Sequence, residues 1–114
     1  MSGITTHVLD TAAGRPAAGV KVRLESEGPG GEWRLMGEGV TDADGRLRTL
    51  LPEGAAVREG VYRLRFETGA YFSAKGQSCF YPRAEVTFRV GASPEHYHVP
   101  LLLSPFGFST YRGS

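Results

Sequence analysis

The 114-residue sequence has one cysteine, no asparagine and no long apolar segment. The single cysteine, Cys79, cannot form a disulfide within the chain, which fits a reducing compartment. A membrane-spanning helix needs roughly 20 consecutive apolar residues, and no stretch approaches that length. The first residues also lack the basic start and apolar centre of a secretory signal peptide. We therefore expect a cytoplasmic protein that does not enter a membrane.

The sequence also lacks a strong excess of either charge. It has 13 lysine and arginine residues against 12 aspartate and glutamate residues, distributed along the whole chain. Nucleic-acid-binding domains usually carry a basic patch or stripe, and none is present. The length fits one domain, and no repeat or linker divides it. We expect a single domain over residues 1–114 that does not bind nucleic acid.

Several common catalytic and binding motifs are missing as well. No glycine-rich phosphate loop follows a strand, and no serine lies in a nucleophile-elbow pattern. Cys79 has no basic neighbour in "GQSCFYP" and is interpreted as a packed or idle thiol. The stretch "TDADGR" begins like a calcium loop but lacks the other ligands and the closing glutamate. It predicts a tight turn at Asp44 and Gly45.

A hydrophobic period of two is the strongest feature that is present. Apolar and charged residues alternate in "VKVRLE", "YRLRFE" and "EVTFRV", and less regularly in "THVLD", "EWRLMGEGVT" and "YHVPLLL". Alternation of this kind predicts strands with one buried and one exposed face. Turn residues, mainly glycine, aspartate and proline, separate these segments. Seven or eight short strands spaced in this way favour an all-β fold, an antiparallel β-sandwich.

Two local features interrupt the strand pattern. Residues 69–77, "GAYFSAKGQ", have glycine near both ends and predict one short helix. Pro100 lies inside "YHVPLLL" and has no N–H to donate to a neighbouring strand. We expect its strand to lie at a sheet edge or to be irregular at this point.

Strand alternation also decides where the histidines point. His98 lies between core-type residues and therefore faces outward, and His7 does the same if Thr6 faces the core. Taken singly, an outward histidine is most simply a solvated side chain, and this interpretation is kept for His96 at the start of its strand. Three histidines also raise the possibility of zinc. The spacing supports it weakly, no supporting carboxylate is evident, and we expect neither a metal nor another cofactor.

Both ends of the chain carry long specific motifs, "ITTHVLDTAAGRPAAGVKVRL" and "YHVPLLLSPFGFSTYRGS". Together with "TDADGR" and "FYPRAEVTF" between them, they resemble the transthyretin-like proteins that act as 5-hydroxyisourate hydrolases. The closing "YRGS" distinguishes these enzymes from transthyretin, the hormone carrier with the same fold. The resemblance covers essentially the whole chain.

The resemblance implies a transthyretin-like (prealbumin-like) sandwich of two four-stranded antiparallel sheets with one short helix. It also implies a homotetramer with a channel between its dimers. The sheet that faces the channel would hold the first strand, the strand after the "DGR" turn and the last two strands. These strands carry the residues considered next.

Carried over residue by residue, the resemblance implies an enzyme site for a purine-derived small molecule. The enzyme hydrolyses 5-hydroxyisourate to 2-oxo-4-hydroxy-4-carboxy-5-ureidoimidazoline in urate degradation. The carrier has lysine, glutamate and threonine where this chain has His7, Arg46 and His98. The alternative is a non-catalytic carrier that binds an aromatic ligand in the channel. The implied catalytic residues are His7, Arg46, His98 and Ser114, and the implied substrate-binding residues are these four with Tyr111, Arg112 and Gly113.

Overall fold

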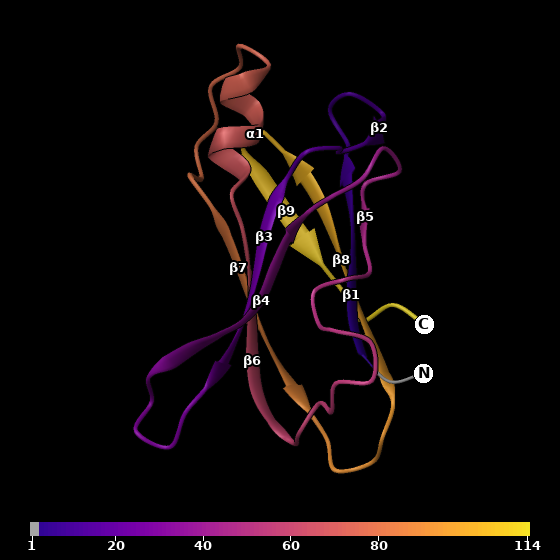
Figure 1. Ribbon diagram of the computed structural model, residues 1–114. Coiled ribbons are helices and arrows are strands. Elements are labelled where there is room, and N and C mark those ends of the chain that lie inside the picture. The colour runs from indigo at the N-terminus through magenta and orange to yellow at the C-terminus, as the bar shows by residue number, and fades with distance from the viewer. Residues whose placement is uncertain (1–2) are drawn as a thin grey trace.

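The computed structural model describes residues 3–114, which form two β-sheets and one short helix (Figure 1). The first sheet contains β1 (Gly3–Asp10), β2 (Arg15–Pro16), β5 (Arg46–Leu47), β8 (His96–Ser104) and β9 (Gly107–Thr110). The second has the order β4 (Trp33–Val40), β3 (Lys21–Glu27), β6 (Gly60–Phe66) and β7 (Ala84–Val90). No helix within residues 3–114 is long and apolar enough to cross a membrane.

Alternating burial creates the core between the sheets. Along β1 every second side chain is buried, beginning with Ile4, and the residues between are partly exposed. The same alternation runs through β6 and most of β8. Because successive strand residues point to opposite faces, each sheet presents one apolar face to the other. The fully buried members of this core include Ile4, Val8, Val22, Leu24, Leu64, Phe66, Leu101 and Leu103.

The first sheet is four strands wide where β2 pairs with β1 and narrower toward the start of β1. β1 pairs with β8 along one edge, and the two short strands β2 and β5 share its other edge at different heights. β9 pairs with the far side of β8. The predicted sandwich with a short helix is therefore confirmed, and β1, β5, β8 and β9 lie in one sheet as expected.

One strand pair departs from the antiparallel prediction. β1 and β8 run parallel over eight residue pairs, from Gly3 opposite His96 to Asp10 opposite Leu103. Hydrophobic alternation looks the same in parallel and antiparallel strands, so the sequence pattern could not reveal the direction. No tight turn constrains these strands, which belong to opposite ends of the chain. The parallel pair brings the first strand beside the strand that carries His98.

The helix α1 (Thr68–Ala74) begins one residue before the predicted segment and ends three residues earlier. Its C-terminus is closed by Gly76, whose φ of 72° is the left-handed conformation that glycine adopts readily. Tyr71 of this helix donates a hydrogen bond of 2.8 Å from its hydroxyl to the buried carboxylate of Asp10. The helix is thereby joined to the end of β1.

Pro100 interrupts the pairing of β8 with the C-terminal segment. The β8·β9 pairing ends with Leu101 opposite Thr110, and it resumes in the same register as a single bridge between His98 and Gly113. The hydroxyl of Thr110 donates to the Pro100 carbonyl at 2.7 Å. The expected irregularity is thus a break in the hydrogen bonding, and it lies beside His98.

Candidate functional site

The turn before β5 places Arg46 beside His7. Asp42 accepts hydrogen bonds at its carboxylate from the N–H groups of Asp44 and Arg46, at 2.9 and 3.0 Å. Gly45 follows with a φ of 75°, and its carbonyl accepts the N–H of Val8 at 2.7 Å. This turn sets the register in which Arg46 lies directly opposite His7 on the outer face of the sheet.

The hydrogen bond that His7 makes shows which of its ring nitrogens carries a proton. Its Nε2 lies 2.9 Å from the backbone carbonyl of Asp44. A carbonyl oxygen only accepts, so Nε2 must carry the proton and donate it. In neutral His7 the lone pair is therefore at Nδ1.

His98 lies one step farther across the same face. It is the direct partner of Thr5 on the parallel strand β1, and His7 is two residues beyond Thr5. The Nδ1 atom of His98 is 2.8 Å from the hydroxyl oxygen of Thr5. Within the described residues Nε2 of His98 has no hydrogen-bond partner. The outer face thus holds His7, Arg46 and His98 together, an arrangement that the family resemblance implied.

The surroundings of His98 favour its neutral form. Burial of the ring lowers the pKa of His98 below its ordinary value of 6.5, and the positive charge of Arg46 lowers it further. His7, His96 and Arg48 act in the same direction with smaller effects. A neutral imidazole at neutral pH can accept a proton, which is the property required of a general base.

Gly113 brings the C-terminal segment against this imidazole. Its N–H donates to the carbonyl of His98 at 2.8 Å. A Cβ at position 113 would lie 2.6 Å from Cδ2 of His98 and 3.3 Å from its Cγ. Only glycine lets the segment lie this close to the ring without moving it, so Gly113 shapes the site directly.

The other three residues of the C-terminal motif lie differently. The Tyr111 side chain is 57% exposed, and Ser114, one residue beyond Gly113, is exposed. Arg112 pairs with Glu95 at 2.8 Å, and its guanidinium carbon lies 4.8 Å from the ring centre of Tyr97, a core-facing residue. Within one chain Arg112 is therefore already paired with a carboxylate, and it lines the same hollow as His98.

Three residues of this face were missed or set aside at the sequence level. Thr5 contacts two histidines, and His96, interpreted above as solvated, lies with its Nε2 2.9 Å from the Thr5 hydroxyl. Arg48 contributes to the low pKa of His98. Thr5 and Arg48 each lie two residues from a predicted site residue, so strand periodicity could have identified both.

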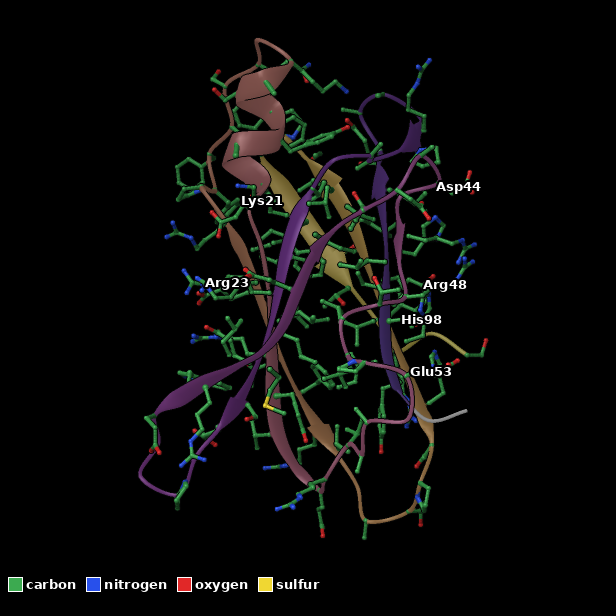
Figure 2. The ribbon with its side chains drawn as sticks, in the orientation of Figure 1. Lys21, Arg23, Asp44, Arg48, Glu53 and His98 are labelled. Carbon is green, nitrogen blue, oxygen red and sulfur yellow. The ribbon has the colours of Figure 1, made fainter. Side chains whose placement is uncertain are left out.

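The long side of the molecule that carries these groups is visible in Figure 2, where Asp44, Arg48 and His98 follow one another along it. A hollow of about 160 Å³ lies beside Thr5, Arg48 and His96, and one of about 240 Å³ lies between His98 and the edge of β7. Ligand pockets usually measure about 300 to 1,000 Å³. These hollows are therefore small for a complete binding site.

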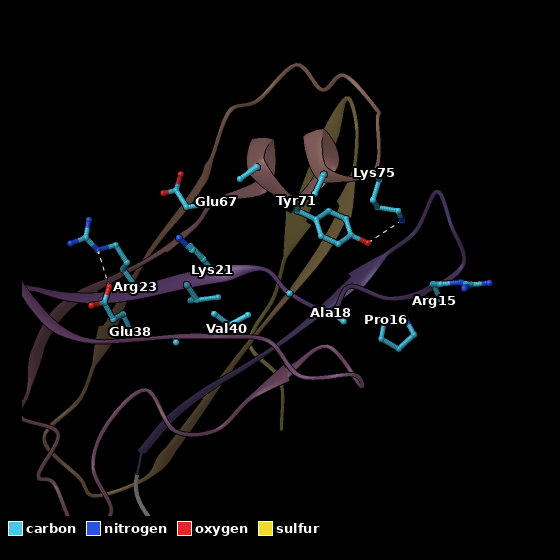
Figure 3. Close-up of a pocket in the computed structure, with 15 residues that line it drawn as sticks. Arg15, Pro16, Ala18, Lys21, Arg23, Glu38, Val40, Glu67, Tyr71 and Lys75 are labelled. Carbon is cyan, nitrogen blue, oxygen red and sulfur yellow. Dashed lines mark hydrogen bonds and ion pairs between the residues drawn. The ribbon is translucent and has the colours of Figure 1, made fainter.

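A larger hollow, of about 950 Å³, lies elsewhere, between α1 and the strands β3 and β4 (Figure 3). Its basic residues include Arg23, paired with Glu38 at 3.8 Å, and Lys75, bonded to the Tyr71 hydroxyl at 3.2 Å. It contains no histidine and no thiol. Histidine and arginine side chains gather instead on the outer face of the first sheet, which we take as the candidate site.

Metal and thiol chemistry receive no structural support at either place. Among residues 3–114 no group of three or more His, Cys, Asp or Glu side chains is arranged to hold a metal ion. Cys79 is half-buried, packs against the core, and its thiol contacts the Tyr81 carbonyl at 3.3 Å. The side chains that gather on the outer face of the first sheet are imidazoles, guanidinium groups and a hydroxyl.

These observations define a class of protein: a two-sheet β-sandwich with histidine and arginine side chains on the outer face of one sheet. A family model described as "HIUase/Transthyretin family" matches residues 4–113. The chain belongs to this family.

Proteins of known structure and function extend the comparison. A 5-hydroxyisourate hydrolase of Halalkalibacterium halodurans is 52% identical over 120 residues, with all of both chains covered. The structure of Klebsiella pneumoniae 5-hydroxyisourate hydrolase superimposes with a TM-score of 0.86 and 41% identity, covering 99% of this chain and 100% of the other. Sea bream transthyretin in complex with thyroxine matches with a TM-score of 0.87 and 37% identity, covering 96% and 93%.

Proposed function

We propose that this chain is an enzyme that hydrolyses 5-hydroxyisourate to 2-oxo-4-hydroxy-4-carboxy-5-ureidoimidazoline. The observation that carries the proposal is the pairing of His7 with Arg46 on the sheet face that also holds His98. Relatives about 50% identical over the full chain are named 5-hydroxyisourate hydrolase. The chemistry of the face and the names of the relatives therefore agree.

The alternative, a carrier for an aromatic ligand, has the same fold. The sea bream carrier and the Klebsiella enzyme superimpose on this chain almost equally well, so the backbone does not separate the two functions. The side chains do, because a carrier site is expected to be mainly apolar. Two imidazoles and the unpaired guanidinium of Arg46 fit a site that moves protons and stabilises negative charge.

Ring opening begins with the activation of water. In the proposed mechanism, Nε2 of His98 accepts a proton from water while the water oxygen bonds to a ring carbonyl carbon. The low pKa of His98 keeps its ring neutral near neutral pH, and Nε2 can then accept the proton when the remaining ring proton is on Nδ1. When the carbon–nitrogen bond of the ring breaks, the proton passes to the departing nitrogen, and His7 shares this proton transfer.

Arg46 stabilises the charge that forms during the attack. The carbonyl oxygen becomes an oxyanion, and a guanidinium that stays protonated is suited to face it. Arg46 forms no ion pair within the described residues, so its charge is not already neutralised by a carboxylate. Its planar donors also suit the carbonyl groups of a flat heterocycle.

We assign the C-terminal residues to substrate binding in an assembled protein. Ser114 orients water or substrate, and Tyr111, Arg112 and Gly113 form the wall beside it. The hollows beside the histidines are small in one chain, which supports a site completed by a neighbouring subunit. We therefore propose a homotetramer with the first sheet facing a central channel, a single domain over residues 1–114, and a cytoplasmic location. Light scattering should give four times the mass of one chain.

The experiment for the activity uses hydroxyisourate made freshly by urate oxidase. The protein should accelerate the decay of its ultraviolet band relative to the uncatalysed reaction. His7→Asn, His98→Asn and Arg46→Glu should each lower turnover by roughly 10²- to 10³-fold without unfolding the chain. Unchanged decay with the unmodified protein would support the carrier instead, and full activity in all three variants would refute the residue assignment.

A further inference from the structure

One hydroxyl group joins two histidines of the outer face. The Thr5 oxygen lies 2.8 Å from Nδ1 of His98 and 2.9 Å from Nε2 of His96. The parallel register places Thr5 directly opposite His98, with His96 two residues earlier on β8. All three therefore point to the same side of the sheet.

Counting protons limits how these groups can bond. A threonine hydroxyl has one proton to donate and two lone pairs that accept. It can therefore donate to only one of the two rings, and the other ring must donate to it. At least one of the two nitrogens that face Thr5 carries a proton.

The surroundings of His98 indicate which one. A ring N–H needs an acceptor, and within the described residues no acceptor is hydrogen-bonded to Nε2 of His98, while the cationic Arg46 and Arg48 that lower its pKa offer only donors. Within the described residues Thr5 is the one side chain that hydrogen-bonds to the ring of His98. The ring proton is thus best satisfied at Nδ1, where it is donated to the Thr5 oxygen.

We propose that Thr5 is a positioning residue that holds neutral His98 with its proton on Nδ1 and its lone pair on Nε2. The Thr5 hydroxyl proton is donated in turn to Nε2 of His96. This proposal rests on the proposed function for the role of His98 as the base. It assigns the base to Nε2 of His98, which has no hydrogen-bond partner within the described residues, whereas the nitrogen left free in His7 is Nδ1.

The opposite arrangement would disable this base. If His96 donated to Thr5 and Thr5 donated to His98, the proton of His98 would lie on Nε2. That nitrogen could then offer a hydrogen bond but could not accept a proton from water. The direction of two hydrogen bonds outside the reacting groups therefore controls whether His98 can act.

The first test needs no activity measurement. Long-range ¹H–¹⁵N NMR spectra of the ¹⁵N-labelled protein distinguish protonated from unprotonated ring nitrogens. The spectra are recorded at about pH 8, above the pKa of an ordinary imidazole. We expect a protonated Nδ1 and an unprotonated Nε2 in both His98 and His96. A spectrum with the proton of either ring on Nε2 overturns the proposal.

The second test compares two substitutions of Thr5. Thr5→Val keeps the shape of the side chain but removes the hydroxyl, whereas Thr5→Ser keeps the hydroxyl. We expect Thr5→Val to lower kcat about tenfold with KM within about twofold, and to increase the Nε2-protonated form of His98. Thr5→Ser should retain kcat within about threefold and keep the spectrum of the unmodified protein. Equal kcat in both variants, or a loss confined to KM, overturns the proposal.

The two tests separate this proposal from the proposed function. If the unmodified protein does not hydrolyse hydroxyisourate, the function fails, yet the NMR spectrum still decides the tautomer of His98. If hydrolysis is normal but the spectrum shows Nε2–H, only the role of Thr5 fails. Should Thr5→Val not fold, the spectrum of the unmodified protein and the activity of Thr5→Ser remain decisive.

Discussion

Gly113 lies against the imidazole of His98 so closely that no larger residue fits without moving the ring. The Gly113 N–H donates to the His98 carbonyl at 2.8 Å, and a Cβ would lie 2.6 Å from Cδ2 of that ring. On the opposite edge of the ring, Nδ1 is hydrogen-bonded to the Thr5 hydroxyl at 2.8 Å. The C-terminal segment and β1 thus hold His98 between them.

We expect Gly113→Ala to reduce activity more than stability. The added methyl group must push the ring aside, which weakens the Thr5 hydrogen bond and shifts Nε2. The loss of one such bond corresponds to roughly 1 kcal/mol, or a several-fold to tenfold fall in kcat/KM. Steady-state kinetics and a urea unfolding curve measure the two effects.

Gly107→Ala is the matched control for this substitution. Gly107 lies in β9, and a Cβ there would meet only the Ser104 hydroxyl at 3.9 Å, an ordinary contact. Its activity should equal that of the unmodified protein. If Gly113→Ala is as active as Gly107→Ala, the close approach to His98 has no catalytic consequence.

Gly45 controls the position of Arg46, and this also can be tested with a matched pair. Gly45 and Gly54 have φ values of 75° and 82°, so alanine is similarly strained at both. At Gly45, however, a Cβ would also overlap the Val8 carbonyl oxygen, whereas at Gly54 nothing lies within 4 Å. Gly45→Ala should therefore cost the strain of about 1 kcal/mol plus a steric penalty and displace Arg46 from His7.

The measurement compares thermal unfolding and kcat for the two alanine variants. Gly54→Ala should be slightly less stable and fully active. Gly45→Ala should be less stable than Gly54→Ala and lose at least tenfold in kcat, as expected when an oriented charge is misplaced. Equal activities would show that the turn does not determine the geometry of the site.

Strand periodicity alone predicted the faces of His7 and His98 correctly. Each lies between residues whose side chains are buried, so the alternation that forms the core also exposes the histidines. Local turn chemistry likewise predicted that Arg46 follows a tight turn. The outward faces of the histidines and the turn before Arg46 depend on residues close together in the sequence, so the sequence alone is enough to predict them.

The contacts between these residues could not be predicted in this way. The parallel pairing of β1 with β8 joins segments about 90 residues apart, and its register depends on packing of the whole sandwich. That register brings His96 to Thr5, although the sequence placed His96 at the edge of a loop. Arg112 was expected beside the site, but in a single chain its partner is Glu95.

The pKa of His98 should appear in the pH dependence of the reaction. Burial, and then the charge of Arg46, lower this pKa, so kcat/KM should fall only as the pH drops through a value below 6.5. Arg46→Gln removes one positive charge, and the acidic limb should then move upward toward 6.5 while turnover falls roughly 10²- to 10³-fold. The control Arg15→Gln, on β2 of the same sheet, should change neither the position of the acidic limb nor the turnover. An acidic limb that stays in place in Arg46→Gln would show that His98 is not the group that titrates.

The buried carboxylate of Asp10 predicts a stability difference that depends on pH. Burial raises the pKa of Asp10, but hydrogen bonds from the Ala13 N–H, Tyr71 and Lys75 outweigh it and lower the pKa below 3.8. The stabilisation that Asp10 provides is therefore present above its unfolded pKa near 3.9, and it is lost as the pH falls through its folded pKa.

Tyr71→Phe removes one of these hydrogen bonds and should cost about 1 to 3 kcal/mol of unfolding free energy at pH 7, and less near pH 3. In Tyr62→Phe the lost bond, 2.8 Å to the carbonyl of Arg58, involves no ionising acceptor, so its cost should not change with pH. Urea unfolding at fixed protein concentration measures both, and equal pH dependence in the two variants would contradict the role given to Asp10.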